Sequence, residues 1–173
     1  MPEKEGLGDS VDDRARRVGP PDREIRFRAA AKAIAASIRR NRSGEGNPDC
    51  PILVEGLRDE KALRALGFTG IVERVNRGWD RSRLVAYLHE TYGTRNIVDK
   101  RPALILLMDW DRTGGRIQSS IRERLMAMDC PVDENLRDVL MRAMKPEGRT
   151  VESLLAHAPS LIPLIERIVL EIS

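Results

Sequence analysis

Residues 103–108 form an uninterrupted apolar run that constrains the fold more than any other part of the sequence. Six apolar residues that end at a charged one, Asp109, are typical of a central strand in a parallel sheet, covered on both faces. Two further strands are predicted over residues 51–54 and 71–75, and a helical pattern follows each of the three. Strands alternating with helices favour right-handed βαβ crossovers. We therefore expect an α/β fold with a mostly parallel sheet and helices on both faces.

Apolar spacing and capping signals predict helices over 23–41, 58–66, 81–92, 117–128, 136–144, 151–156 and 161–172. Asp22 is the expected N-cap of the first helix. The last helix is apolar nearly all round, which implies burial in the core or at a subunit contact. We divide the chain into a disordered tail (1–21), a basic amphipathic helix (22–46), an α/β domain (47–135) and a C-terminal helical extension (136–173).

The composition is that of a soluble globular protein. With 41% hydrophobic and 33% charged residues, 173 residues suffice for one compact core with short extensions. No apolar run approaches the roughly 20 residues that span a bilayer, and the N-terminus lacks the apolar segment of a secretory signal. We expect a cytoplasmic protein without a membrane partner. Cys50 and Cys130 lie far apart without a CxxC motif, so neither a zinc site nor a disulfide framework is indicated.

The first predicted helix carries a local excess of positive charge. Residues 23–42 hold seven basic side chains against one acid, Glu24, on a chain whose net charge is +3. Such a helix could follow a phosphate backbone, with Arg39, Arg40 and Arg42 as candidate nucleic-acid contacts. The alternative is a docking helix whose polar face happens to be basic.

Two acidic motifs each follow a predicted strand. They read Glu55-Gly56-Leu57-Arg58-Asp59 and Asp109-Trp110-Asp111-Arg112-Thr113-Gly114-Gly115. Parallel strands present their carboxyl ends at one edge, where ligands bind, so Glu55, Asp109 and Asp111 converge if the two strands are neighbours. Asp109 and Asp111 point to the same side, and Trp110 points elsewhere. Crowded carboxylates repel one another, so we expect a hard divalent cation, Mg²⁺ or alternatively Mn²⁺.

Small and basic residues accompany these acids. Gly56 and the pair Gly114-Gly115 are expected just before helices, where backbone N–H groups can approach a phosphate. Four basic residues in or after these loops could balance phosphate charge: Arg58, Lys61, Arg112 and Arg116. Either acidic motif taken alone could instead be a helix N-cap. Trp79, in a loop at the same edge, either stacks on a base or packs over a helix end.

Residues 52–59, followed by the apolar run into Asp109-Trp110-Asp111, resemble the Toprim domain shared by topoisomerases, bacterial-type primases and several nucleases. The chain as a whole resembles the small stand-alone Toprim proteins of archaea. The resemblance implies a Rossmann-like α/β fold in which Glu55 is a general acid/base or metal-associated residue. It also implies that Asp109 and Asp111 hold Mg²⁺ and that Asp59 assists. Leu57 departs from the pattern, since many members have a basic residue there.

The resemblance leaves the reaction open. A topoisomerase needs a second domain with a nucleophilic tyrosine, and Tyr87 and Tyr92 lie on a predicted helix of the core. A primase needs a zinc module and a larger body. A metal-dependent nuclease remains, of the type that matures structured ribosomal RNA, as does a non-catalytic module that binds RNA or a ribonucleoprotein.

A rival interpretation comes from the string Asp109-Trp110-Asp111-Arg112-Thr113, which matches the DxDxT motif of haloacid-dehalogenase-type phosphatases. That class needs a later lysine, and Lys145 alone follows, on a helical segment. It also leaves the motif that begins at Glu55 unexplained. The oligomeric state stays open.

Overall fold

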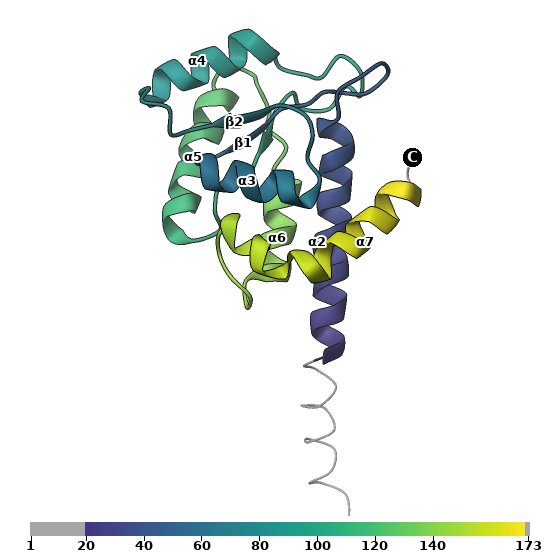
Figure 1. Ribbon diagram of the computed structural model, residues 1–173. Helices are drawn as coiled ribbons and strands as arrows, with labels where there is room; N and C mark the ends of the chain where they lie inside the picture. Colours follow the sequence, from purple (N-terminus) through teal and green to yellow (C-terminus); the bar gives the residue numbers. More distant parts are fainter. Residues whose placement is uncertain (1–19, 172–173) are drawn as a thin grey trace, which may run out of the picture.

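The structure is a computed structural model that describes residues 20–171 (Figure 1). The predicted tail, 1–21, lies almost entirely outside the described residues. In chain order the elements are α2 (Pro20–Asn41), β1 (Ile52–Val54), α3 (Leu57–Leu66), β2 (Val72–Arg74), α4 (Arg81–Tyr92), β3 (Ile105–Leu106), α5 (Arg112–Met126), α6 (Asn135–Met144), the 3-10 helix η1 (Glu152–His157) and α7 (Ala158–Glu171).

The three strands form a parallel sheet in the order β2-β1-β3. Ile52 of β1 is paired with Val72 of β2 on one side and with Ile105 of β3 on the other. The predicted α/β fold with a parallel sheet is therefore confirmed. Strand β3 is shorter than the apolar run 103–108, although all six of those residues are buried.

Alternating side chains of the strands build a core on each face of the sheet. Ile52, Val54, Ile105 and Leu107 join residues of α2, α3, α6, η1 and α7 in one cluster. Leu53, Leu104, Leu106 and Met108 join residues of α4 and α5 in the other. In Figure 1, α4 and α5 lie on one side of the strands, and α2, α3 and α6 lie on the other. The expected helices on both faces are confirmed.

Helix α2 is the long docking element of the first cluster. Phe27, Ile34 and Ile38 lie on its buried stripe, and the helix packs against α6 and α7. Asp22 is not its N-cap, as predicted, because the described helix already includes Pro20 and Pro21. The Asp22 carboxylate instead accepts a 2.9 Å hydrogen bond from Nε of Arg26, one turn later.

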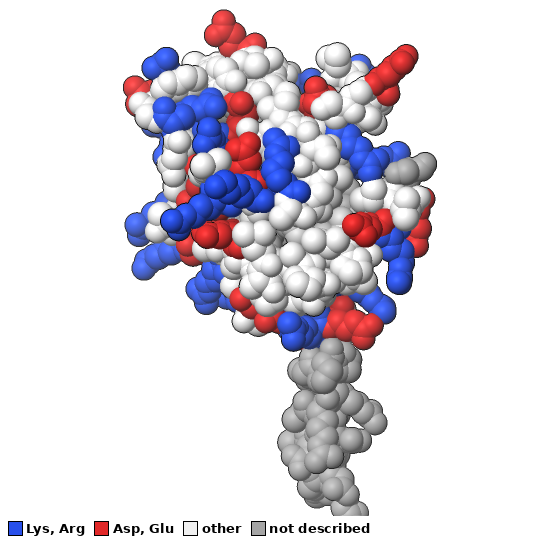
Figure 2. All heavy atoms as spheres, in the orientation of Figure 1, with Lys and Arg blue, Asp and Glu red and all other residues white. Residues whose placement is uncertain are grey.

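Helix α7 is only half buried. Leu161 and Ile165 enter the core, whereas Leu170 is 78% exposed, and Figure 2 shows a broad white surface in the region where Figure 1 draws α7. With η1 it forms a helical span, Glu152–Glu171, that is long and apolar enough to cross a membrane. The expectation that no segment approaches this length was wrong. The buried side chains of α7, Leu161 and Ile165, pack on α2 and α3, so this part of the span belongs to the core of the domain.

Candidate functional site

The two acidic motifs meet at the carboxyl edge of the sheet because β1 and β3 are adjacent parallel strands. The backbone N–H of Asp109 donates a 3.1 Å hydrogen bond to Oε1 of Glu55. Burial raises the pKa of Glu55 above its usual value, this hydrogen bond lowers it, and the charges of Asp59 and Asp111 raise it further. The structure thus brings Glu55, Asp59, Asp109 and Asp111 within electrostatic reach of one another; we call them the acidic cluster.

Asp59 is the buried member of the acidic cluster. Its Oδ2 accepts a 3.0 Å hydrogen bond from the backbone N–H of Gly56, the residue that caps α3. Burial raises its pKa, and the nearby carboxylate of Glu152 adds to the increase. Asp59 therefore fixes the turn from β1 into α3, directly after Glu55.

Asp109 is the member of the acidic cluster whose pKa is shifted most. Burial raises its pKa to about 7, and the charges of Glu55, Asp59 and Asp111 act in the same direction. A 2.8 Å hydrogen bond from the backbone N–H of Val151 to Oδ1 opposes the shift. The site therefore favours the protonated form of Asp109 more than water does, and a cation binding there would favour the charged form.

Asp111 is the N-cap of α5, and its Oδ1 accepts a 2.7 Å hydrogen bond from the N–H of Gly114. Helix α5 starts at Arg112, five residues earlier than predicted, so Gly114 and Gly115 lie in its first turn. Their predicted place in a loop before the helix was wrong. The N–H of Gly115 donates to the carbonyl of Asp111, and that of Gly56 to Asp59, so these amides already have partners within the protein.

Gly114 has a packing role instead. A Cβ atom at this position would overlap the carbonyl group of Asp109, whereas a Cβ at Gly115 would make an ordinary 3.6 Å contact with Nη2 of Arg137. The start of α5 therefore approaches Asp109 as closely as only glycine allows.

Arg137 of α6 donates hydrogen bonds to the backbone of the acidic cluster, a role that was not predicted from the sequence. It is 8% exposed, and its Nε and Nη2 donate to the carbonyl of Asp109 at 3.3 and 3.0 Å, while Nε also lies 3.2 Å from the carbonyl of Met108. Its charge lowers the pKa of Glu55. The signal in the sequence was an arginine within the apolar stripe that Leu136, Leu140 and Met144 form.

The segment before η1 closes over the second acidic motif. Trp110 is buried and points away from the acidic cluster, as predicted. Its backbone N–H donates to the carbonyl of Arg149 at 2.9 Å, and its Nε1 donates to the carbonyl of Gly148 at 2.8 Å. Together with the bond from Val151 to Asp109, these contacts fasten residues 148–151 to the site.

The donor set suits a hard divalent cation, since three carboxylates offer oxygen ligands. Glu55, Asp109 and Asp111 each use one oxygen for a backbone N–H, which leaves the second oxygen of each for a ligand. Among residues 20–171, however, no three His, Cys, Asp or Glu side chains already surround one common position. Binding would therefore require side-chain rotation around the cation.

The predicted phosphate-binding side chains differ in position. Arg58, Lys61, Arg112 and Arg116 are exposed on α3 and α5. None of these four forms an ion pair with a residue in the described part of the chain. Their charges are therefore available to a ligand at the carboxyl edge of the sheet.

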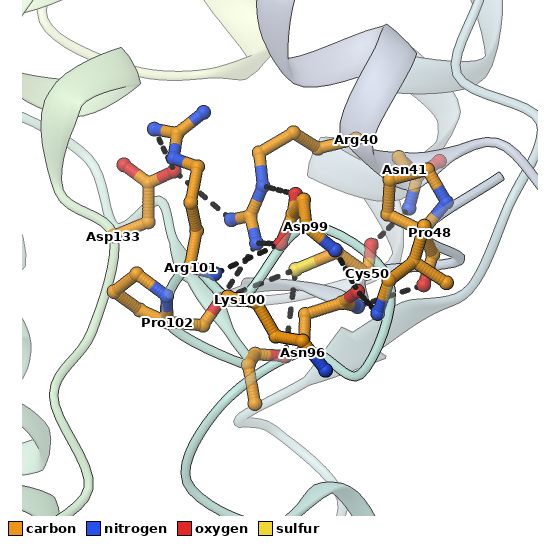
Figure 3. A network of polar contacts seen from close by, with 12 residues as sticks. Arg40, Asn41, Pro48, Cys50, Asn96, Asp99, Lys100, Arg101, Pro102 and Asp133 are labelled. Atoms are coloured by element: carbon orange, nitrogen blue, oxygen red, sulfur yellow. Dashed lines mark hydrogen bonds and ion pairs between the residues drawn. The ribbon is translucent and has the colours of Figure 1, made fainter.

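Arg40 does not have the predicted role. It is 4% exposed, and its guanidinium group is paired with Asp99 at 2.6 Å and with Asp133 at 3.1 Å, while Nη2 also donates to the carbonyl of Pro102 (Figure 3). Arg39 is exposed and Arg42 half-buried. This end of α2 lies beside the residues that precede β1 and β3, at the edge opposite to the acidic cluster. The docking interpretation of the helix therefore holds for Arg40.

Trp79 packs over the start of α4. Its ring makes an edge contact with Tyr87, with centroids 5.2 Å apart, and the guanidinium groups of Arg77 and Arg83 lie 4.7 and 4.3 Å from its centroid. The loop before it adjoins the acidic cluster, because the N–H of Asn76 donates to the carbonyl of Glu55. Cys50 and Cys130 are both buried, and burial raises the pKa of Cys50 to about 12.

No family model matches the chain. It is similar to UPF0292 proteins of Thermococcus species. It is 32% identical over 107 residues to that of Thermococcus onnurineus (strain NA1), a match that covers 60% of this chain and 69% of the relative. It is 29% identical over 105 residues to that of Thermococcus sibiricus, covering 60% and 73%. Among solved structures, a putative protein from Aquifex aeolicus is 27% identical with a TM-score of 0.48, and the match covers 71% of this chain and 93% of that one.

Proposed function

This chain belongs to the UPF0292 family, and we propose that it is a Mg²⁺-dependent protein of the Toprim type that acts on nucleic acid in the cytoplasm. Structured RNA is the preferred substrate and phosphodiester hydrolysis the reaction, with Mn²⁺ as an alternative ion. The observation that carries the proposal is the acidic cluster itself. Its four carboxylates lie at the carboxyl ends of adjacent parallel strands, where α/β proteins bind ligands, and burial together with neighbouring carboxylate charges raises the pKa of Glu55 and of Asp109.

Each residue has a distinct part in this proposal. Glu55, Asp109 and Asp111 would hold the cation, which would supply positive charge for a phosphoryl oxygen and lower the pKa of a bound water. Arg137 keeps the carbonyl of Asp109, and with it the second acidic motif, in place. Asp59 holds the turn that follows Glu55.

Proton transfer falls to the residue whose environment suits it. Glu55 has a raised pKa and uses only one of its oxygens for a backbone N–H, so it can take up and release a proton more readily than an ordinary glutamate. Four exposed cations, Arg58, Lys61, Arg112 and Arg116, would bind the phosphates of the substrate.

A non-catalytic module that binds RNA or a ribonucleoprotein is the second candidate. The absence of three ready-made ligands around one position among the described residues favours it. The phosphatase alternative is weaker, because Lys145 is exposed at the end of α6 and forms no bond to Asp109. It also assigns no role to Glu55, which is hydrogen-bonded to Asp109.

Cleavage of a labelled RNA hairpin and a DNA hairpin in Mg²⁺ or Mn²⁺ tests the proposal. We expect the wild type to cleave RNA, EDTA to stop cleavage, and Glu55→Gln to lower the rate by at least a hundredfold. Glu90→Gln, on the exposed side of α4, is the matched control and should cleave normally. Binding without cleavage would establish the second candidate. Full cleavage by Glu55→Gln would show that the acidic cluster is not the site.

A further inference from the structure

A shallow groove runs along α5, away from the acidic cluster. Its lining comes from one helix and consists of Arg112, Gly115, Arg116, Ser119, Ser120, Glu123 and Arg124. Spacings of three and four residues place these side chains on one face. Gly114, Gln118, Ile121 and Leu125 are buried on the opposite face. The groove therefore follows the helix axis, and its first arginine is the residue after Asp111.

The positive charges in this groove are not neutralised by the protein. The lining of the groove contains three arginines and one acidic residue, Glu123. Arg112 and Arg116 have no ion-pair partner in the described part of the chain, and Arg124 donates only to Oγ of Ser82, at 3.0 Å. Arg122 of the same helix, outside the groove, is by contrast paired with Glu134 at 3.0 Å. An anion is therefore the ligand that the groove suits.

The distance between the first and the last arginine of the groove indicates which kind of anion would fit it. Arg112 and Arg124 are twelve residues apart, which corresponds to about 18 Å along a helix that rises 1.5 Å per residue. That distance equals the rise of roughly five nucleotides in one strand of a duplex. A mononucleotide could reach one end of the row only. A polymer with regularly spaced phosphates could contact both ends.

The basic surface continues beyond the far end of the row. Ser82, the partner of Arg124, belongs to the start of α4, and its neighbour Arg83 is exposed over the ring of Trp79. Figure 2 shows blue side chains gathered on the side of the molecule where Figure 1 places α4 and α5, with red ones between them.

We infer that Arg112, Arg116 and Arg124 form a track for the sugar-phosphate backbone of a nucleic acid, and that the substrate is a polymer entering the acidic cluster along α5. This inference rests on the proposed function, which it deepens. It replaces α2 as the backbone-binding element, since Arg40 is buried at the opposite edge of the sheet.

Binding of a labelled RNA hairpin in EDTA tests the track without any contribution from metal or cleavage. The variant carries Arg112→Gln, Arg116→Gln and Arg124→Gln. Three lost phosphate contacts should reduce the slope of log K against log salt by about 2 to 3 and weaken binding at least tenfold in 0.1 M salt. The control carries Arg39→Gln, Arg142→Gln and Arg167→Gln, three exposed arginines on other helices, and should bind like the wild type.

A single change, Arg116→Gln, guards against misfolding of the triple variant. Arg116 is exposed and has no ion-pair partner among residues 20–171, so this variant should melt like the wild type. The magnitude of its slope of log K against log salt should fall by about 0.7 to 0.9, the value for one phosphate contact. AMP should compete poorly at a phosphate concentration equal to that of the hairpin. An unchanged slope in both variants, or equal competition by AMP, would overturn the inference. Neither result bears on Glu55→Gln, so a failure of the track and a failure of the acidic cluster remain distinguishable.

Discussion

The backbone N–H of Asp109 lies 3.1 Å from Oε1 of Glu55 and joins two acidic motifs that are 54 residues apart in the chain. This bond stabilises the charged form of Glu55, whereas burial favours its neutral form. Asp109 has a single backbone donor at its own carboxylate, from Val151, and its pKa rises to about 7. The first prediction concerns the cost of this arrangement in the metal-free protein.

Asp109→Asn should stabilise the metal-free protein at pH 8. The folded chain holds the proton of Asp109 more tightly than the unfolded chain does, so wild-type stability falls as the pH rises from about 4 to about 7. Asparagine removes this loss and can still accept from Val151. We expect a gain of about 1–2 kcal/mol at pH 8 and almost none at pH 4. Urea denaturation in EDTA at both values measures it.

The control for this experiment is Asp129→Asn, a change at an exposed residue after α5. It should leave the pH dependence of unfolding as in the wild type. A gain for Asp109→Asn that is the same at pH 4 and pH 8 would show that the charge of Asp109 is not its cause.

Mg²⁺ should raise the melting temperature of the wild type. A ligand that binds only the folded state stabilises it by about 1.4 kcal/mol at ten times its Kd. Asp109→Ala and Asp111→Ala should lose most of that increment, and Glu90→Gln should keep it. Glu152 is unsuitable as the control because its charge raises the pKa of Asp59. The melting temperatures are measured by scanning calorimetry. An equal increase in all four proteins would show that Mg²⁺ does not bind at the acidic cluster.

Gly114→Ala and Gly115→Ala should differ in sign. A methyl group at Gly114 would overlap the carbonyl of Asp109, and we expect a loss of about 2–3 kcal/mol together with loss of cleavage. At Gly115 the new Cβ has room, and alanine is a better helix former by about 1 kcal/mol. Thermal unfolding of both variants is the measurement. Similar stability of the two proteins would mean that the close approach of α5 to Asp109 is misjudged.

Arg40→Gln should destabilise the protein by about 2–3 kcal/mol, because it removes the buried cation between Asp99 and Asp133 and leaves Asp133 with only the half-exposed Arg101 as an ion-pair partner. Arg39→Gln, a change at the adjacent exposed residue, should stay within about 0.5 kcal/mol of the wild type. Urea denaturation at pH 7 compares the two. A small loss for Arg40→Gln would indicate that solvent screens the pair.

Much of the architecture could be predicted because it depends on local patterns. The apolar run 103–108 and the helical spacing predicted three strands that alternate with helices. Because parallel strands present their carboxyl ends at one edge of a sheet, Glu55 was expected beside Asp109. The start of α5 was predicted too late because the ligand role of Asp111 was preferred to the N-cap alternative, whereas Asp111 is the N-cap that begins the helix.

The rest depends on contacts between distant segments, which carry no local signal. Arg137 reaches the carbonyl of Asp109 only because α6 packs beneath the sheet, and Val151 reaches its carboxylate from 42 residues away. Arg40 was predicted as a nucleic-acid contact because the helical stripe alone does not show that Asp99 and Asp133 lie opposite it.

The bonds that fasten residues 148–151 to Trp110 and Asp109 make the C-terminal part integral to the domain. A fragment that ended at residue 135, the boundary suggested by the sequence, would lack Arg137, Val151 and the helices α6, η1 and α7 of the first core cluster. It would expose to water the apolar side chains of α2 and α3 that pack on these helices, and it should not fold independently. The recognisable acidic motifs are therefore not a portable unit, and grafting residues 52–114 into another protein would transfer the carboxylates without the scaffold that orients them.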